Sequence, residues 1–170
     1  IQYADEIITI DIDDKKYNAQ QRSRQLKTTA RNHVDGDFLY VDCDTIIVKS
    51  FYEIDNFKYD IAACIDTHSE FSKNPYRRMC VEDGNALGWP IGKETEYFNS
   101  GIIYVKDNEV TRNFYKQWNK CLNEGYRKKV YMDQPSFAKA NYELGHPIKR
   151  LDDLFNCELK HGIKFLKDAY

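Results

Sequence analysis

Three pairs of aspartates, each separated by a single residue, are the side chains best suited to bind a divalent cation. They are Asp11 with Asp13, Asp35 with Asp37, and Asp42 with Asp44. A hard cation takes several oxygen ligands, commonly one or two protein carboxylates with phosphate and water supplying the rest. Aspartate is frequent in this chain, so the spacing alone does not select among the pairs and their surroundings decide.

Only the third pair is flanked by apolar runs on both sides. Residues two apart on an extended strand project to the same face, and open α/β sheets bind ligands at the carboxyl edge of their strands. Asp42 and Asp44 therefore predict a metal or phosphate site, with a solvated strand end as the alternative. Gly36 inside the second pair favours a positive φ and predicts a turn. The first pair runs into the charged segment 14–16, which indicates a solvated loop.

The segments around these aspartates predict alternating strands and helices. Apolar runs over 6–13, 38–41 and 61–65 have strand length, and 45–48 continues the second run. The long charged side chains of 19–34 suit a helix that covers the sheet. Apolar runs without alternation are typical of strands buried on both faces, and strand–helix–strand order implies parallel pairing. We therefore expect an α/β fold with helices on both faces of a parallel sheet.

Beyond the third run, residues 66–96 show no periodicity and are too long for a simple connector, so they predict a functional loop or lid. Segment 97–105 predicts a further strand. Helical spacing then extends over 110–122, behind a cap at Asp107 or Asn108.

Glycines mark the expected ends of the last two helices. Gly125 is expected to end the helix that contains Phe114 and Trp118, two residues that we assign to the core. Asp133 is suited to cap a second helix, which Gly145 closes.

The composition excludes several classes of protein. Lys and Arg total 25 against 27 Asp and Glu, and the formal net charge of −2 gives no global reason to expect nucleic acid or an anionic membrane as a partner. No apolar run approaches the roughly 18–20 residues that span a bilayer. The five cysteines are widely spaced, with no C-x-x-C pair, and indicate reduced thiols. We expect a cytoplasmic protein, with peripheral membrane association left open.

Four segments occur in the order and with the spacing of a known family. Segment 36–45 resembles the D-x-D strand of GT-A-fold glycosyltransferases, especially family 8, the group that includes glycogenin and bacterial galactosyltransferases. Segment 97–103 resembles that family's F-N-[AS]-G strand, and 131–135 resembles its D-Q helix start. Segment 22–27 resembles the stretch in which a basic residue faces the donor phosphates.

The resemblance implies a GT-A-like fold, with a mixed, mostly parallel sheet flanked by helices. It also implies a metal-dependent hexosyltransferase that moves sugar from a nucleotide donor, in particular a UDP-sugar, to a hydroxyl of a glycan or lipid-linked sugar and retains anomeric configuration. The donor phosphates would be bound by Lys27 or Arg24 and by Mn²⁺ or Mg²⁺ on Asp42 and Asp44. The residues that would contact the sugars are Asn99, Asp133 and Gln134.

Departures from the family pattern lead us to expect a single catalytic domain over 1–170 that is truncated at both ends. The family's first nucleotide-binding unit should precede Ile1. The histidine that completes its metal site is expected beyond Tyr170, because His161 and Gly162 do not match the spacing of the family's H-x-x-G-x-K-P-W-like stretch.

Simpler roles and rival functions remain open at this stage. Lys27 and Arg24 also suit a solvated helix face, Asn99 a strand kink, and Asp133 a helix cap. Tyr76 and Trp89 are candidates for stacking on an acceptor sugar. A magnesium-dependent phosphatase of the haloacid dehalogenase type also places D-x-D after a buried strand, but its later motifs do not follow in order. A non-catalytic fragment that binds carbohydrate or a divalent ion is the third alternative.

Overall fold

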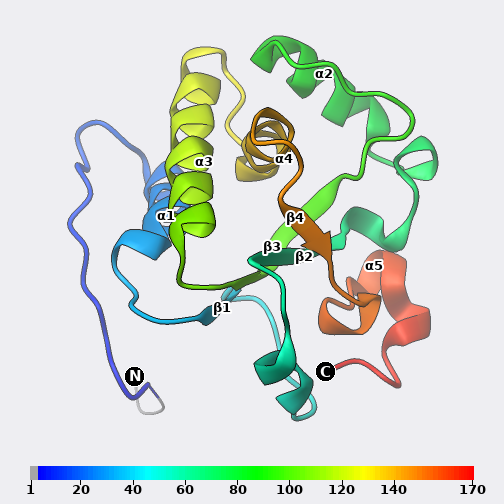
Figure 1. Cartoon of the computed structure of the whole chain (residues 1–170). Helices are drawn as coiled ribbons and strands as arrows, with labels where there is room; N and C mark the ends of the chain where they lie inside the picture. The colour runs from blue at the N-terminus through cyan, green and yellow to red at the C-terminus, as the bar shows by residue number, and fades with distance from the viewer. Residues whose placement is uncertain (1–3) are drawn as a thin grey trace.

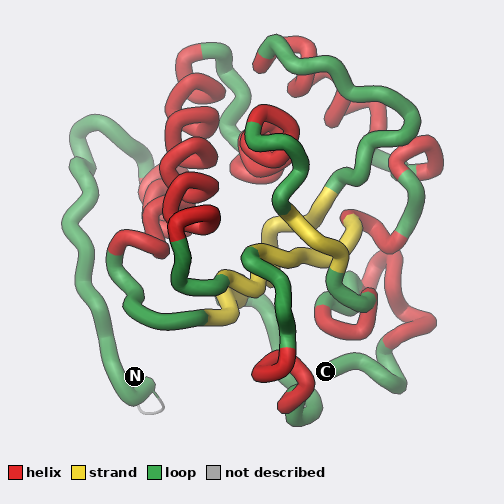
Figure 2. Tube along the Cα trace, in the orientation of Figure 1, coloured by secondary structure: helices red, strands yellow, loops and turns green. Residues whose placement is uncertain are grey.

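A computed structural model describes residues 4–170. The strands form one sheet, and the helices pack against it (Figure 1). The strands are β1 (Phe38–Val41), β2 (Ile61–Ile65), β3 (Phe98–Val105) and β4 (Ile148–Arg150). The α-helices are α1 (Ala19–Thr29), α2 (Arg77–Leu87), α3 (Glu109–Arg127), α4 (Asp133–Glu143) and α5 (Leu159–Gly162). Loops and short 3₁₀ turns connect them (Figure 2).

The sheet is mixed, with the strand order β1-β3-β2-β4. β3 is antiparallel to both of its neighbours, whereas β2 and β4 are parallel. The mixed sheet is therefore confirmed, but the expectation of a mostly parallel sheet is wrong. β3 is antiparallel because segment 66–96 does not cross to the far end of the sheet. The Asp66 N–H donates to the Tyr97 carbonyl over 2.9 Å, so β3 begins beside the end of β2 and runs back.

Both faces of the sheet are covered, as the unbroken apolar runs predict. All five residues of β2 are buried. Ile61, Ala63 and Ile65 pack in one cluster with α3 and α4, while Ala62 and Cys64 pack in another on the opposite face. Figure 1 shows α1, α3 and α4 together on one side of the sheet and α5 on the other.

The longest helix begins and packs as its sequence predicts. The Asn108 side chain caps α3 by accepting the Thr111 N–H over 3.1 Å. Phe114 and Trp118 are fully buried, which confirms them as core residues. The expected end at Gly125 is wrong by two residues, because α3 continues through Arg127.

Asp133 is the first residue of α4 and does not cap it. The cap position belongs to Met132, whose side chain makes no capping bond. The expected cap is therefore wrong, and the Asp133 carboxylate is available for contacts outside its own helix. Gly145 follows the helix with a φ of 76°, which confirms the predicted end.

Two predicted strands are irregular, and one helix comes from a segment predicted to be a loop. Residues 6–13 form no strand, and 45–48 form an exposed loop in which Ile46 is 80% exposed. Within 66–96 lies α2, whose buried residues are Cys80, Gly84 and Leu87. Their spacing is helical, but a glycine stands in the middle of the buried face, so the apolar periodicity is not visible. No helix among residues 4–170 is long and apolar enough to cross a membrane.

Candidate active site

One edge of the sheet collects polar residues from several strands. Because β3 runs opposite to the other three strands, its first residues meet the last residues of its neighbours. Asp42 follows β1, Asp66 follows β2, and Asn99 and Ser100 stand near the start of β3. The Asp42 N–H donates to the Gly101 carbonyl over 2.8 Å. Because β3 is antiparallel, the Asn99 amide and the Ser100 hydroxyl near its start lie beside the predicted aspartate pair. A parallel β3 would bring its last residues to this edge instead.

A cavity of about 670 Å³ lies at this edge. Its carboxylate and amide residues are Asp42, Asp44, Asn99, Asn156 and Glu158, and apolar residues from β1, β3, 45–51 and the C-terminal segment form most of the remaining wall. Over residues 4–170, no lysine or arginine lines it. The polar part of this largely apolar wall therefore presents oxygen acceptors and amides, which suit a cation or the hydroxyl groups of a ligand.

Asp42 and Asp44 both line the cavity, although not as consecutive side chains of an extended strand. β1 ends at Val41, and the Thr45 N–H donates to the Asp42 carbonyl over 3.1 Å, which closes a turn. The premise that both carboxylates project from one strand face is therefore wrong. The turn nevertheless brings both residues to the cavity, with Asp42 half-buried and Asp44 exposed.

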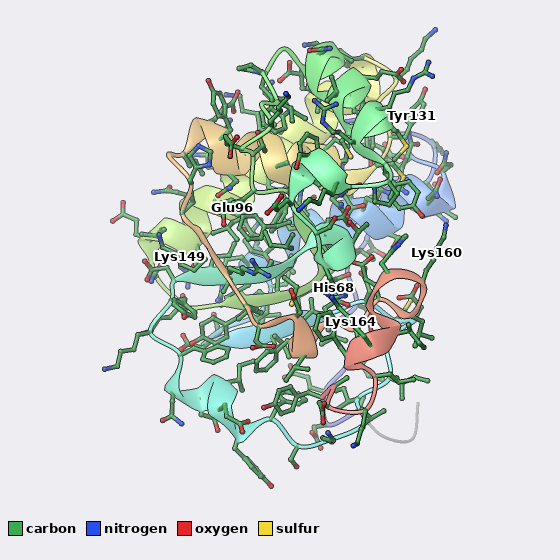
Figure 3. All side chains as sticks on the ribbon, turned by 90° about the vertical axis from the view of Figure 1, so that its right-hand side faces the viewer. His68, Glu96, Tyr131, Lys149, Lys160 and Lys164 are labelled. Atoms are coloured by element: carbon green, nitrogen blue, oxygen red, sulfur yellow. The ribbon has the colours of Figure 1, made fainter. Side chains whose placement is uncertain are left out.

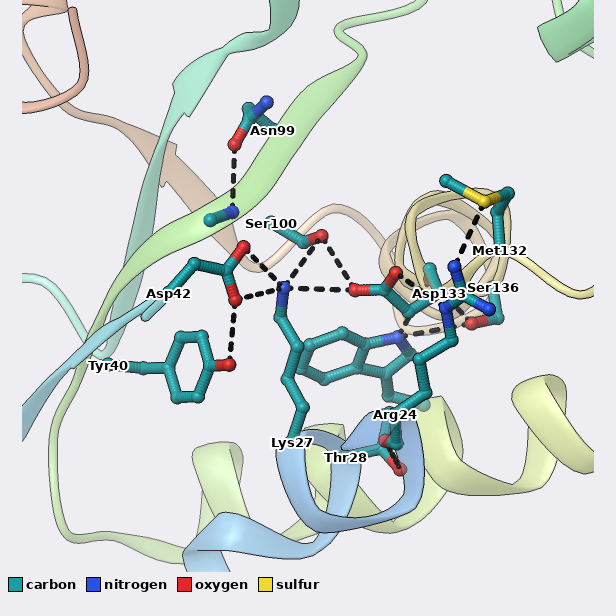
Figure 4. A network of polar contacts seen from close by, with 12 residues as sticks. Arg24, Lys27, Thr28, Tyr40, Asp42, Asn99, Ser100, Met132, Asp133 and Ser136 are labelled. Atoms are coloured by element: carbon teal, nitrogen blue, oxygen red, sulfur yellow. Dashed lines mark hydrogen bonds and ion pairs between the residues drawn. The ribbon is translucent and has the colours of Figure 1, made fainter. Parts of the chain in front are cut away.

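Lys27 contacts both Asp42 and Asp133, for which the family resemblance implies separate roles in binding the cation and the sugar (Figure 4). Its Nζ lies 3.1 Å from Asp42 Oδ1 and 3.0 Å from Asp133 Oδ2. Ser100 Oγ lies 3.3 Å from the same Nζ and donates to Asp133 Oδ2 over 3.0 Å. The Tyr40 hydroxyl donates to Asp42 Oδ1 over 2.7 Å. Lys27 is only 7% exposed, so the interpretation as a solvated helix face is wrong.

Asp133 is held by its backbone as well as by its carboxylate. The Trp118 Nε1–H donates to the Asp133 carbonyl over 3.1 Å, and the Ser136 hydroxyl donates to the same oxygen over 2.6 Å. Burial raises the pKa of Asp133, but the charge of Lys27 and the hydrogen bonds from Lys27 and Ser100 outweigh it and hold this pKa below its ordinary value. Asp133 is therefore an anion that neutralises a buried lysine.

Arg24 lies on the other side of Asp133. Its Nε is 3.5 Å from Asp133 Oδ1, and one terminal nitrogen lies 3.1 Å from Met132 Sδ. The other terminal nitrogen is buried and has no hydrogen-bond partner among residues 4–170. The structure thus places both predicted basic residues, Arg24 and Lys27, around Asp133, and only Lys27 reaches the aspartate pair.

Asn99 uses all of its side-chain hydrogen-bonding capacity inside the protein. Its Nδ2 donates to Asp66 Oδ1 over 3.3 Å and to Glu158 Oε1 over 3.4 Å. Its Oδ1 accepts the Gly101 N–H over 2.8 Å and the Asn156 amide over 3.0 Å. Asn99 lines the cavity, but on the face of β3 opposite Ser100, and it fixes the groups around it.

The remaining predicted residues lie away from the cavity wall. Gln134 is half-buried in the first turn of α4, and its side chain makes no hydrogen bond to residues 4–170. Trp89 is 4% exposed and packs beside Tyr142, so it belongs to the core and is not available to stack on an acceptor. Tyr76 is 37% exposed and lies edge-on to His161.

Several residues at this edge were missed by the sequence analysis. Asp66 follows a buried strand as Asp42 does, a signal that could have identified it. Asn156 and Glu158 belong to an irregular segment and carry no such signal. The Glu158 N–H donates to His68 Nε2 over 3.2 Å, and Figure 3 shows His68 beside the C-terminal segment that carries Lys160 and Lys164.

The donor set fits a cation that depends on its substrate for further ligands. No group of three or more His, Cys, Asp or Glu side chains within residues 4–170 is arranged to hold a metal. A Cβ on Gly101 would lie 3.2 Å from Asp42 Oδ2 and 2.9 Å from Asn99 Oδ1, so the glycine leaves the room that this carboxylate needs. Two carboxylates suit Mg²⁺ or Mn²⁺ that takes its remaining oxygens from phosphates and water.

Comparison with known families agrees with this chemistry. The family model of the nucleotide-diphospho-sugar transferases matches residues 14–168. The chain belongs to this family. No curated protein and no solved structure gives a significant match. The match supports a transferase that takes sugar from a nucleotide donor, and it gives no support to the phosphatase alternative.

Proposed function

We propose that this transferase is metal-dependent and uses a UDP-hexose donor. Asp42 and Asp44 would hold Mn²⁺ or Mg²⁺ against the donor diphosphate. When bound, the cation supplies stabilisation of the negative charge that develops on the leaving nucleoside diphosphate. The observation that carries the proposal is the presence of both aspartates on one cavity wall, in a chain whose family uses nucleotide-diphospho-sugars.

The chain's own residues prepare this site. Lys27 and Tyr40 orient the Asp42 carboxylate before any ligand binds, with contacts of 3.1 and 2.7 Å to Oδ1. Asp133 balances the charge of Lys27, and we therefore propose it as a positioning residue rather than a sugar contact. Preorganised polar groups need no rearrangement during the reaction, which is the source of their catalytic value.

The finer parts of the proposal follow the resemblance to family 8. They are retention of anomeric configuration, a hydroxyl acceptor on a glycan or lipid-linked sugar, and sugar contacts from Asn99 and Gln134. Asn99 lines the cavity with both of its side-chain groups hydrogen-bonded inside the protein, so a sugar contact from Asn99 requires release of one of these bonds. Gln134 reaches the sugar only if the nucleotide-sugar extends towards the start of α4. The five cysteines are free thiols, which fits the cytoplasmic location that we propose.

The test is release of UDP from a panel of UDP-hexoses in the presence of Mn²⁺. Asp42→Asn and Asp44→Asn should each lower the rate roughly 100-fold or more, since each removes charge from the cation site. Asp35→Asn is the matched control, because Asp35 belongs to another aspartate pair and is exposed. Activity that survives both cavity substitutions would overturn the metal assignment.

A further inference from the structure

Glu158 lies on the cavity wall, between the 3₁₀ turn Asp153–Phe155 and α5. It is half-buried, and one carboxylate oxygen is fixed. Its Oε1 accepts the Thr67 N–H over 2.9 Å and the Asn99 amide over 3.4 Å. Thr67 adopts a left-handed φ of 57°, and a β-branched residue in that region is strained. The strained backbone therefore supplies one of the two donors that hold this oxygen.

The second carboxylate oxygen of Glu158, Oε2, makes no hydrogen bond to residues 4–170. Oε2 has no hydrogen-bond donor among these residues, and it is not one of their buried polar atoms without a partner. Oε2 is therefore accessible to a ligand. Burial and the neighbouring Asp66 raise the pKa of Glu158, although the Thr67 N–H and His68 oppose the rise. The carboxylate is thus anchored on one side and open to a hydrogen-bond donor on the other.

The composition of the cavity indicates what kind of ligand would donate a hydrogen bond to Oε2. No lysine or arginine lines the cavity in the part of the chain that the structure describes. A neutral ligand with hydroxyl groups can satisfy a fixed carboxylate oxygen without a counter-charge. Asp42 and Asp44 line the same cavity, so a donor whose diphosphate is held near them brings its sugar into the same space.

We propose that Glu158 is a sugar-binding residue of the transferase, whose Oε2 accepts a hydrogen bond from a hydroxyl of the donor hexose. Asn99 and Thr67 act as positioning groups for this carboxylate. The inference rests on the proposed function, because it requires a nucleotide-sugar in the cavity. A purely structural Glu158 would only anchor Thr67 and Asn99 through Oε1.

Glu158→Gln separates these two roles. The glutamine oxygen can accept the same two hydrogen bonds, while its amide group replaces Oε2 with a donor. The measurement is calorimetric binding of UDP, UDP-glucose and UDP-galactose in Mn²⁺ to the whole chain. We expect the better-binding UDP-hexose to lose roughly tenfold or more in affinity, the range for a hydrogen bond to a charged group, and UDP alone to be unchanged. Glu96→Gln, at an exposed position, is the matched control.

Two results would overturn the inference while leaving the proposed function intact. One is an equal loss of affinity for UDP and the UDP-hexose, which would mean that the substitution disturbs the cavity as a whole. The other is unchanged affinity for both ligands. A wild-type chain that binds neither UDP nor either UDP-hexose in Mn²⁺ would overturn the proposed function and this inference together.

Discussion

The Lys27 ammonium lies 3.0 Å from the Asp133 carboxylate, and the two side chains are only 8% and 12% exposed. This ion pair joins α1 to the start of α4, and the same ammonium lies 3.1 Å from Asp42. Burying charges costs free energy, so a buried pair is weak evidence for net stability, but removal of one partner leaves an uncompensated charge. The pair therefore makes the orientation of Asp42 depend on the packing of both helices.

Lys27→Met should destabilise the fold strongly. We expect the free energy of unfolding to fall by about 3–5 kcal/mol at neutral pH, the range for breaking a buried ion pair from one side. Urea denaturation measures the change. The double variant Lys27→Met/Asp133→Asn should be more stable than Lys27→Met alone, because it removes one of the two carboxylates that lose the Lys27 charge. Lys73→Met, which breaks an exposed pair with Glu70, is the control and should show no measurable change. A Lys27→Met protein as stable as this control would contradict the prediction.

The stability of the protein should also depend on pH through Asp133. Its pKa in the folded state lies below its ordinary value, so the unfolded state binds more protons in the interval between the two. Asp133 therefore contributes stability that is fully present above the unfolded pKa of about 3.9 and is lost as pH falls through the folded pKa. Asp133→Asn should reduce the slope of unfolding free energy against pH below about pH 5.

Asp83 provides a control of opposite sign for this measurement. Burial raises its pKa, so its contribution is present at low pH and is lost as pH rises. Asp83→Asn should therefore make the loss of stability on acidification steeper, and Asp133→Asn should make it shallower. The slopes are measured by urea denaturation between about pH 3 and pH 7. Equal slopes in both variants would contradict the conclusion that the folded state lowers the pKa of Asp133.

The sequence contains strong signals for the elements that carry the site and weak signals for how they meet. The apolar runs of β1 and β2 and the F-N-S-G segment of β3 identify three strands, and Asp42 and Asn99 with them. The direction of β3 was not predictable, because it depends on where segment 66–96 returns the chain to the sheet. Only the antiparallel direction brings Asn99 to the end of β1.

The pairing of charges within the site was also hidden from the sequence. Lys27 and Asp133 are 106 positions apart, and each had a sufficient local explanation as a solvated helix residue and a helix cap. Glu158 lies in a segment with no periodicity, so its place on the cavity wall follows from tertiary contacts to Thr67 and Asn99 alone. Local patterns identify strands and caps, whereas such long-range contacts depend on the whole fold.

Asn99 should tolerate loss of its side chain better than replacement by a carboxylate. Its amide donates to Asp66 and Glu158, and Asn99→Asp would place a third carboxylate against these two. Asn99→Ala should cost about 1–3 kcal/mol through groups left unsatisfied, and Asn99→Asp should cost more at neutral pH. The difference should shrink as pH falls and the carboxylates protonate. Thermal or urea unfolding of both variants at pH 7 and pH 5 tests this order, and an Asn99→Asp protein as stable as the wild type would contradict it.

Gly101 should be needed for the geometry of the cavity rather than for the conformation of its own backbone. A Cβ there would lie 2.9 Å from Asn99 Oδ1 and 3.2 Å from Asp42 Oδ2, and Asn99 is held by four hydrogen bonds. Gly101→Ala should therefore displace both side chains. We expect a loss of about 1–3 kcal/mol in stability, typical of overpacking.

The same substitution should weaken Mn²⁺-dependent binding of UDP by roughly tenfold or more, because a change to the groups that orient a metal ligand typically costs about 10–100-fold in affinity. Titration calorimetry with UDP in Mn²⁺ measures this loss. Gly92→Ala is the matched control, since the nearest atoms to its Cβ would be 4.0 Å away, and it should bind UDP as the wild type does. If Gly101→Ala retained wild-type affinity while losing stability, Asp42 would not depend on the space beside Gly101 to bind the cation.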